Sequence, residues 1–186
     1  MKRVYLSLGC NIPDRCARIE RALQLLHQSG VAVQRVSSFY RTEPVGYKDQ
    51  PWFVNCAAEV TTHLMPLQLM RRCKSIEGEM GRRPGPRNGP RVIDIDILLY
   101  ENAVVQSAEV TIPHPRMMER RFVLVPLSEI AADAEHPVSK QTVREMLQAT
   151  PDASQVAKLP GDILSPHAVR CTQQGQRRSK ETTDDR

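Results

Sequence analysis

The sequence contains no apolar run long enough to cross a membrane, and the apolar stretch after its basic start, Met1 to Arg3, ends by Leu8. A stretch this short is not a signal peptide. The five cysteines are odd in number and include no CxxC pair, which is typical of reduced thiols in the cytosol and not of a disulfide-stapled secreted domain. We therefore expect a cytoplasmic protein that does not associate with a membrane.

Aromatic residues are scarce, with three Phe, four Tyr and one Trp among 186 residues, so the core must be mainly aliphatic. The hydrophobic share of 40% is enough for one globular core in a chain of this length. Beyond Thr150 the sequence turns to Gln, Ser, Thr, Pro and charged residues. We expect one folded domain over residues 1–150 and a C-terminal extension, 151–186, that is largely disordered.

Positive charge is concentrated in one loop. The formal net charge is only +5, but four arginines are interspersed with glycines in a short segment: Arg82, Arg83, Arg87 and Arg91 with Gly81, Gly85 and Gly89. A flexible loop of this kind can bring guanidinium groups onto phosphate oxygens. The segment therefore favours a polyanion site, and a solvated basic loop or a nucleic-acid contact is the alternative.

Two acids interrupt a β-branched run that otherwise reads as a buried strand. Asp94 and Asp96 are two positions apart, so the strand period places both on one face. The opposite face carries Ile93, Ile95, Ile97 and Leu99. Neighbouring carboxylates repel each other unless a positive group, usually a divalent metal, neutralises them. The pair predicts a site for one or two Mg²⁺ ions; ordinary acids on a solvated strand are the alternative.

A second strand pattern runs from Trp52 to Thr61. One face is apolar and is predicted to be core, with Val54, Cys56, Ala58 and Val60. The other face is predicted not to be core and carries Phe53, Asn55, Ala57 and Glu59. Phe53 and Asn55 offer an aromatic plate and an amide, which together suit a flat heterocycle. Ordinary packing at a sheet edge explains the pair equally well.

The order of elements predicts a ferredoxin-like α+β sandwich with an antiparallel sheet. Strands are expected at 4–8, 31–40, 52–61 and 92–99. A first helix has Asn11 or Asp14 as its cap, and a second is opened by Pro66. One face of the sheet would carry these helices, and the loops 42–51 and 81–90 would roof the other. The apolar segment 122–130 is ambiguous between strand and helix, and a short helix ends near Leu147.

Two weaker signals involve single side chains. His114 lies between two prolines and could contact a phosphate or ribose, although a lone His in such a turn is more often structural. Lys74 and Glu77 are three positions apart on a predicted helix, which favours a simple surface pair.

Several blocks together resemble the 6-hydroxymethyl-7,8-dihydropterin pyrophosphokinase family. They occur in the family's order and cover about residues 1 to 150: Gly9-Cys10-Asn11, Ser38-Phe39-Tyr40-Arg41-Thr42, Asp49-Gln50-Pro51 with Phe53 and Asn55, Ile76-Glu77, Gly81-Arg82, Gly89-Pro90-Arg91 with Ile93-Asp94-Ile95-Asp96-Ile97-Leu98, and Pro113-His114-Pro115 with Arg120 and Phe122. The resemblance implies transfer of pyrophosphate from ATP to the hydroxymethyl group of 6-hydroxymethyl-7,8-dihydropterin, with release of AMP. It makes residues 1–150 a pyrophosphokinase catalytic domain of folate biosynthesis, expected to act as a monomer and without nucleic acid.

The resemblance also assigns site residues by position. Asp94 and Asp96 would hold two Mg²⁺ ions, and Arg82 and Arg91 would neutralise charge on the triphosphate. The pterin would contact Thr42, Glu43, Pro44, Val45, Phe53, Asn55 and Phe122. The nucleotide would contact Glu77, Arg82, Arg87, Arg91, Ile97, Thr111, His114 and Arg120.

The chain departs from the family pattern at a few positions. Asn88 stands where members usually have Trp, and Pro84 stands where a second loop arginine is common. Neither change removes a metal ligand. No residue is an obvious general base, so we expect catalysis to rest on positioning and charge neutralisation.

Two other functions fit parts of the sequence. An RNA-binding module on this fold needs two or three exposed aromatics on the central strands and no acids beside them. A two-metal nucleotidyltransferase would use the same acid pair but would release pyrophosphate instead of AMP.

Overall fold

The computed structural model describes residues 1–83 and 89–160. Its larger sheet has six strands in the order β5-β1-β4-β3-β8, with β2 also paired to β4. The elements are β1 Lys2–Cys10, α1 Arg15–Gln28, β2 Val31–Val36, β3 Tyr40–Thr42, β4 Phe53–Thr62, α2 Pro66–Glu79, β5 Asp94–Tyr100, β6 Val105–Gln106, β7 Thr111–Ile112, a 3₁₀ turn Met117–Glu119, α3 Arg121–Ala131, α4 Val143–Ala149 and β8 Val156–Lys158. No helix in these described ranges is long and apolar enough to span a membrane.

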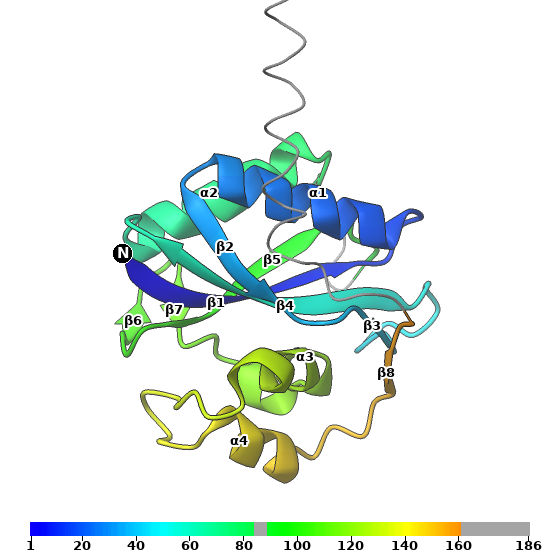
Figure 1. Cartoon of the computed structure of the whole chain (residues 1–186). Coiled ribbons are helices and arrows are strands. Elements are labelled where there is room, and N and C mark those ends of the chain that lie inside the picture. Colours follow the sequence, from blue (N-terminus) through cyan, green and yellow to red (C-terminus); the bar gives the residue numbers. More distant parts are fainter. Residues whose placement is uncertain (84–88, 161–186) are drawn as a thin grey trace, which may run out of the picture.

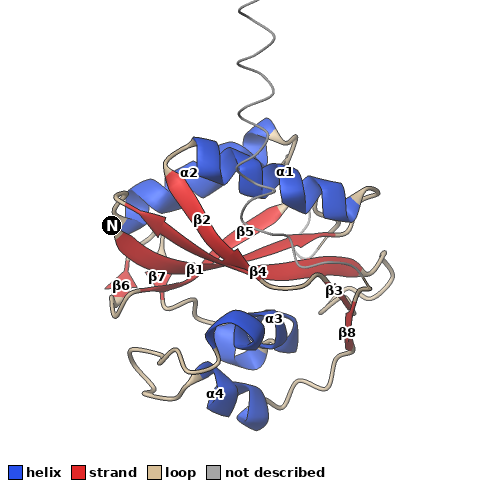
Figure 2. Ribbon diagram, in the orientation of Figure 1, coloured by secondary structure: helices blue, strands red, loops and turns tan. Residues whose placement is uncertain are grey.

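The topology confirms the predicted ferredoxin-like α+β sandwich. The strands β5, β1, β4 and β2 lie side by side and every pair is antiparallel. Helices α1 and α2 cover one face of the sheet, while α3 and α4 lie on the other (Figure 1). The second face is therefore covered partly by helix, not only by loops as expected. Figure 2 shows the resulting order of helix, sheet and helix.

The core has two parts, one on each side of the sheet. Between the sheet and α1 and α2 lie large aliphatic side chains that include Leu6, Leu23, Leu69 and Ile95. On the other side, α3 and α4 pack against Tyr5, Ala57, Leu98 and Leu99. The ambiguous segment 122–130 is thus a helix, α3. Its packing makes the second face of β4 core at Ala57, which is 1% exposed, so the prediction of a non-core face is wrong there.

A register shift in β5 moves one predicted core residue to the opposite face. Tyr5 of β1 pairs with Leu99, but the next residue, Leu6, pairs with Ile97. Leu98 is the extra residue, and a bulge of this kind reverses the alternation beyond it. Leu99 therefore packs under α3, not on the face of Ile95 and Ile97 as predicted.

The predicted strand 31–40 is divided in two. A side-chain oxygen interrupts the ladder between β2 and β3: the Ser37 N–H still donates to the Ala57 carbonyl at 2.8 Å, but the Ala57 N–H donates to the Ser37 hydroxyl at 2.9 Å. Glu129 of α3 accepts the Ser38 N–H at 3.1 Å, the Ser38 hydroxyl at 2.8 Å and the Tyr40 hydroxyl at 2.7 Å. These contacts pull the chain toward α3 and end β2 at Val36.

The Glu129 contacts predict a pH dependence of stability. Burial raises the pKa of Glu129, but the hydrogen bonds from Tyr40 and Ser38 outweigh it and hold the pKa below the ordinary value of 4.5. A carboxyl with a lowered folded-state pKa contributes stability that is present above its unfolded pKa and is lost as the pH falls through the folded one. We expect urea midpoints of the parent to fall more steeply below pH 4.5 than those of Glu129→Gln. Equal slopes in the two proteins would contradict this.

The predicted C-terminal extension includes one short strand, β8. Strand β8 pairs antiparallel with β3, with Val156 opposite Thr42 and Lys158 opposite Tyr40. The edge of a sheet offers free backbone donors and acceptors, with which a strand of only three residues can pair. Residues 161–186 lie outside the described chain.

Candidate active site

A cleft opens on the α3 side of the sheet. It is lined by residues from β1, β3, β4 and β5, from the loops after β3 and before β5, and from the segment that leads into α3 with its first turn: Ser7, Gly9, Thr42, Glu43, Val45, Gln50, Phe53, Asn55, Gly89, Arg91, Asp94, Asp96, Arg116, Glu119, Arg120 and Phe122. The acid pair and the predicted ring slot therefore belong to one cavity.

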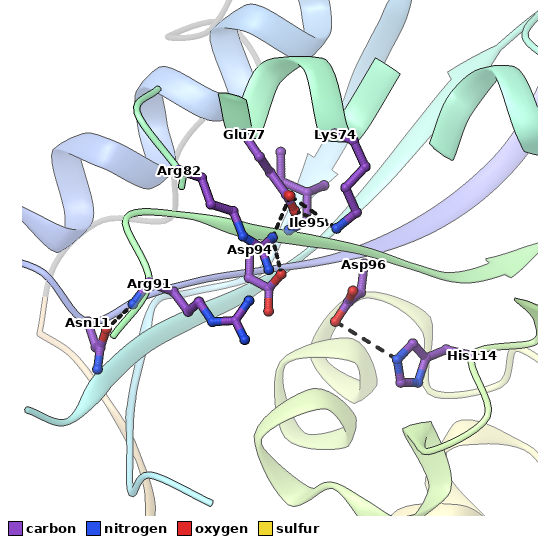
Figure 3. A network of polar contacts seen from close by, with 9 residues as sticks. All are labelled: Asn11, Lys74, Glu77, Arg82, Arg91, Asp94, Ile95, Asp96 and His114. Carbon is purple, nitrogen blue, oxygen red and sulfur yellow. Dashed lines mark hydrogen bonds and ion pairs between the residues drawn. The ribbon is translucent and has the colours of Figure 1, made fainter. Parts of the chain in front are cut away.

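The two acids lie on one face of β5, as the strand period predicts. Their side chains are 35% and 32% exposed. Asp94 accepts a hydrogen bond of 2.6 Å from Arg82, while the nearest ion-pair contact of Asp96, to His114 Nε2, is 3.9 Å (Figure 3). Burial and then the charge of Asp94 raise the pKa of Asp96. A rise of this origin means that negative charge at Asp96 is under-compensated.

His114 does not supply the missing positive charge. Burial lowers its pKa, and the guanidinium groups of Arg120 and Arg116 lower it further against the opposing effect of Asp96. Its Nδ1 accepts the Arg116 N–H at 3.2 Å, so in the neutral ring the proton is on Nε2, which faces Asp96.

The donor set around the acids fits a magnesium nucleotide better than a structural metal centre. Within residues 1–83 and 89–160, no group of three or more His, Cys, Asp or Glu side chains could hold a metal ion. Mg²⁺ typically takes one or two carboxylates and completes its shell with waters and substrate phosphates. Asp94 and Asp96 supply that number of carboxylates, and they face a cleft that is open to a ligand.

A chain of charges connects the acids to α2. Glu77 is 2% exposed and accepts the N–H of Ile95 at 2.8 Å, which satisfies a donor on the edge strand β5. It also binds Lys74 at 3.0 Å and pairs with Arg82, which in turn binds Asp94 (Figure 3). Burial raises the pKa of Glu77 against the effect of these cations. The surface-pair interpretation of Glu77 is therefore wrong, because its carboxylate is a buried link between α2, β5 and Arg82.

Asn11 ties together the ends of the two long loops. Its Oδ1 accepts the Arg91 N–H at 2.7 Å, and its Nδ2 donates to Gln50 at 2.9 Å and to the Pro51 carbonyl at 3.2 Å. Asn11 is therefore not the cap of α1. Asp14 occupies the cap position, but its side chain makes no capping hydrogen bond.

Six of the seven predicted pterin residues line the cleft, and we call this group the ring slot. They are Thr42, Glu43, Val45, Phe53 and Asn55, from β3, β4 and the loop after β3, and Phe122, from the first turn of α3. Asn55 Nδ2 donates to the Thr42 hydroxyl at 2.6 Å, which leaves its Oδ1 and one amide hydrogen. Pro44 is buried and is not among the lining residues.

The predicted nucleotide residues are only partly brought together. Arg91 and Arg120 line the cleft, and His114 lies beside Asp96. The Arg120 guanidinium lies 5.4 Å from the centre of the Phe122 ring. Ile97 is 2% exposed in the core beneath α1 and α2, and Thr111 is exposed on β7. Arg87, Asn88 and Pro84 lie outside the described residues.

Several lining residues were missed by sequence reasoning. Ser7 and Gly9 of β1 pair directly with Asp96 and Asp94, and their small size and spacing of two could have indicated that β1 continues the polar face. Arg116 and Glu119 line the cleft from the 3₁₀ turn before α3. No local pattern marks them, because the turn is positioned by its packing and not by a sequence period.

Gly9 is required by the close approach of Asn55. A Cβ at Gly9 would lie 2.3 Å from Asn55 Oδ1, so Gly9→Ala must displace the amide and its bond to Thr42. We expect a loss of about 1–3 kcal/mol of unfolding free energy, measured by urea denaturation. Gly78→Ala is the matched control, because nothing lies within 4 Å of a Cβ there and Ala favours a helix interior. Equal effects of the two substitutions would contradict this account.

Comparisons with known proteins point to one family. The model of the family described as 7,8-dihydro-6-hydroxymethylpterin-pyrophosphokinase matches residues 5–132. The 2-amino-4-hydroxy-6-hydroxymethyldihydropteridine pyrophosphokinase of Bacillus subtilis is 47% identical over 132 residues, which are 70% of this chain and 79% of that protein. The protein of the same name from Methylorubrum extorquens is 47% identical over 148 residues, 79% of this chain and 92% of that one.

Longer proteins also match. The folic acid synthesis protein fol1 of Schizosaccharomyces pombe is 46% identical over 151 residues, which are 81% of this chain but only 21% of that protein. A solved Plasmodium falciparum HPPK-DHPS structure, with pterin and p-hydroxybenzoate, has a TM-score of 0.63 at 18% identity and covers 79% of this chain and 41% of its own. At that identity the likeness concerns the fold. The extent of the family match and the identity to the two bacterial relatives show that the chain belongs to the 7,8-dihydro-6-hydroxymethylpterin-pyrophosphokinase family.

Proposed function

We propose that this protein transfers the pyrophosphate group of ATP to the hydroxymethyl group of 6-hydroxymethyl-7,8-dihydropterin and releases AMP, as a Mg²⁺-dependent step of folate biosynthesis. Membership of the family supports the reaction. The single observation that carries it in this chain is that the acid pair, Asp94 and Asp96, and the slot with Phe53 and Phe122 line one cleft. A nucleotide's phosphates and a flat ring would therefore meet there.

The phosphate end of the reaction is assigned to β5 and its neighbours. Asp94 and Asp96 would hold two Mg²⁺ ions, which neutralise charge on the phosphates and lower the pKa of the attacking hydroxyl. Arg91 and Arg82 would stabilise negative charge on the transferred group. Burial and the charge of Arg116 lower the pKa of Arg120. Arg120 forms no ion pair within residues 1–83 and 89–160, which suits it to bind an anionic ligand.

The ring end is assigned to the walls of the slot. Phe53 and Phe122 would contact the two faces of the pterin. Asn55 would hydrogen-bond its edge through the Oδ1 and the amide hydrogen that Thr42 does not use. This arrangement would hold the hydroxymethyl group toward the acids, so that catalysis rests on positioning.

No side chain is assigned as a general base. In its neutral form His114 directs Nε2–H toward Asp96, because its Nδ1 is occupied by the Arg116 N–H. Removal of the hydroxyl proton therefore depends on the lowered pKa of the hydroxyl itself. We further infer that the protein acts on these two small molecules as a cytoplasmic monomer, without nucleic acid or a membrane.

The identity of the nucleotide product tests this function. Incubation with ATP, Mg²⁺ and the reduced pterin should release AMP in a 1:1 ratio to the pterin diphosphate, measured by chromatography with mass detection. A nucleotidyltransferase would instead release free pyrophosphate and leave a nucleotide on the acceptor. Release of pyrophosphate, or of ADP, contradicts the proposal.

A further inference from the structure

The first part of the C-terminal extension connects the two sides of the ring slot. We call residues 152–158 the C-terminal strap. It begins at the first turn of α3, which carries Phe122, and ends as β8 beside β3, which leads into the loop with Glu43 and Val45 (Figure 1). Phe122, Glu43 and Val45 all line the cleft.

Asp152 ties the strap to α3. Its Oδ2 accepts the N–H of Arg121, the first residue of the helix, at 2.7 Å, and its Oδ1 accepts the N–H of Ser154 at 2.9 Å. The residue at the helix cap, Arg120, provides no side-chain cap of its own. Asp152, which lies 31 residues further along the chain, therefore supplies a hydrogen-bond acceptor that the start of a helix requires. The N–H that it accepts belongs to Arg121, the residue directly before Phe122.

The other end of the strap is tied to the loop after β3. The Glu43 N–H donates to the Gln155 carbonyl at 3.0 Å, and the Gln155 N–H donates to the Glu43 carboxylate at 3.4 Å. Strand β8 continues the ladder with β3, and the Leu159 N–H donates to the Phe39 carbonyl at 2.8 Å. Lys158 also pairs with Glu129 of α3 at 3.4 Å.

We propose that the strap positions the pterin slot, with Asp152 as the positioning residue that fixes the first turn of α3, and hence Phe122, against the wall formed by β3 and its loop. This inference rests on the proposed function, because it assigns the pterin to that slot. Within residues 1–83 and 89–160, no hydrogen bond or ion pair connects the strap to Asp94, Asp96 or Arg91. A change in the strap should therefore weaken binding of the pterin and leave binding of the nucleotide unchanged.

The test compares ligand binding by Asp152→Ala with a matched control in the full chain. The control is Ser154→Ala, because it removes only a hydroxyl beside Asp152 and keeps both backbone N–H groups that donate to the Asp152 carboxylate, those of Arg121 and Ser154. We expect the dissociation constant for 6-hydroxymethylpterin, measured by calorimetry, to rise about tenfold in Asp152→Ala. The constant for Mg²⁺ with a non-hydrolysable ATP analogue should stay within about twofold. Ser154→Ala should bind both ligands as the parent does.

A conservative variant and an exchange measurement separate positioning from folding. Asp152→Asn keeps one of the two acceptor oxygens and should restore part of the pterin affinity. Amide hydrogen exchange of the peptide 117–124 should be faster in Asp152→Ala than in the parent, and unchanged in Ser154→Ala. Amide exchange is measured without any ligand, so it reports the hydrogen bond between Asp152 and the start of α3 and not the binding of the pterin.

Three results would overturn the inference: parent-like pterin affinity in Asp152→Ala, equal weakening of both ligands with a lower melting temperature, or unchanged exchange at 117–124. A parent protein that binds the pterin but releases no AMP contradicts the proposed transfer instead. The role of the strap is still tested in that case, because its test measures ligand binding and amide exchange and not turnover.

Discussion

Asp96→Ala should reduce turnover by about a thousandfold or more while leaving the protein folded. The substitution removes one of the two carboxylates assigned to Mg²⁺, and charge neutralisation by metal is worth several kcal/mol of transition-state stabilisation. Steady-state release of AMP, measured at saturating Mg²⁺ and both substrates, gives the effect.

Loss of the Asp96 charge should not destabilise the metal-free protein. Burial and Asp94 raise the pKa of Asp96, so its ionised form opposes folding near neutral pH. We expect Asp96→Asn to melt at or above the parent temperature. Asp133→Ala, an exposed acid paired with Arg144 outside the cleft, is the control and should retain parent activity. Turnover of Asp96→Ala within a few-fold of the parent would count strongly against the metal assignment.

Arg82→Ala should lower kcat by about a hundredfold and change the Michaelis constants much less. In this structure Arg82 is shared by Glu77 and Asp94. If Mg²⁺ occupies Asp94 in the reacting complex, the guanidinium is free to meet charge on the transferred group. An interaction made only in the transition state appears in kcat and not in the Michaelis constant.

Two variants sharpen this second test. Arg71→Ala removes a guanidinium from α2, the helix that precedes Arg82 in the sequence, where it pairs with exposed Glu109, and it should behave like the parent. Arg82→Lys keeps the charge but loses the planar fork and should recover only part of the rate. A change confined to the Michaelis constants would show that Arg82 serves ground-state binding alone.

The sequence predicts those parts of the fold that follow a local period. The alternation in 52–61 and the spacing of Asp94 and Asp96 place β4 and the acid face of β5 correctly, because a strand repeats every two residues regardless of its neighbours. Leu99 fails this rule, since the bulge at Leu98 depends on how β5 meets β1. A register shift between two strands leaves no mark within either one.

The features that the sequence misses are long-range polar contacts. Ser38 is linked to Glu129, which is 91 residues away, and this contact divides the predicted strand 31–40. The helical spacing of Glu77 and Lys74 predicts a surface pair, but the Glu77 carboxylate is buried because it accepts the Ile95 N–H at the edge of the sheet. Strand β8 likewise forms by pairing with the edge of β3, and its three residues are too few to show an alternating pattern of their own. Such partners are known only once the topology is known.

The measurement that tests the central claim most directly is a crystal structure with Mg²⁺ and a non-hydrolysable ATP analogue. The account predicts metal density in contact with both Asp94 and Asp96, at about 2.1 Å from their oxygens, with the phosphates between them and the slot of Phe53 and Phe122. Bare carboxylates, with the nucleotide bound elsewhere on the protein, would contradict it.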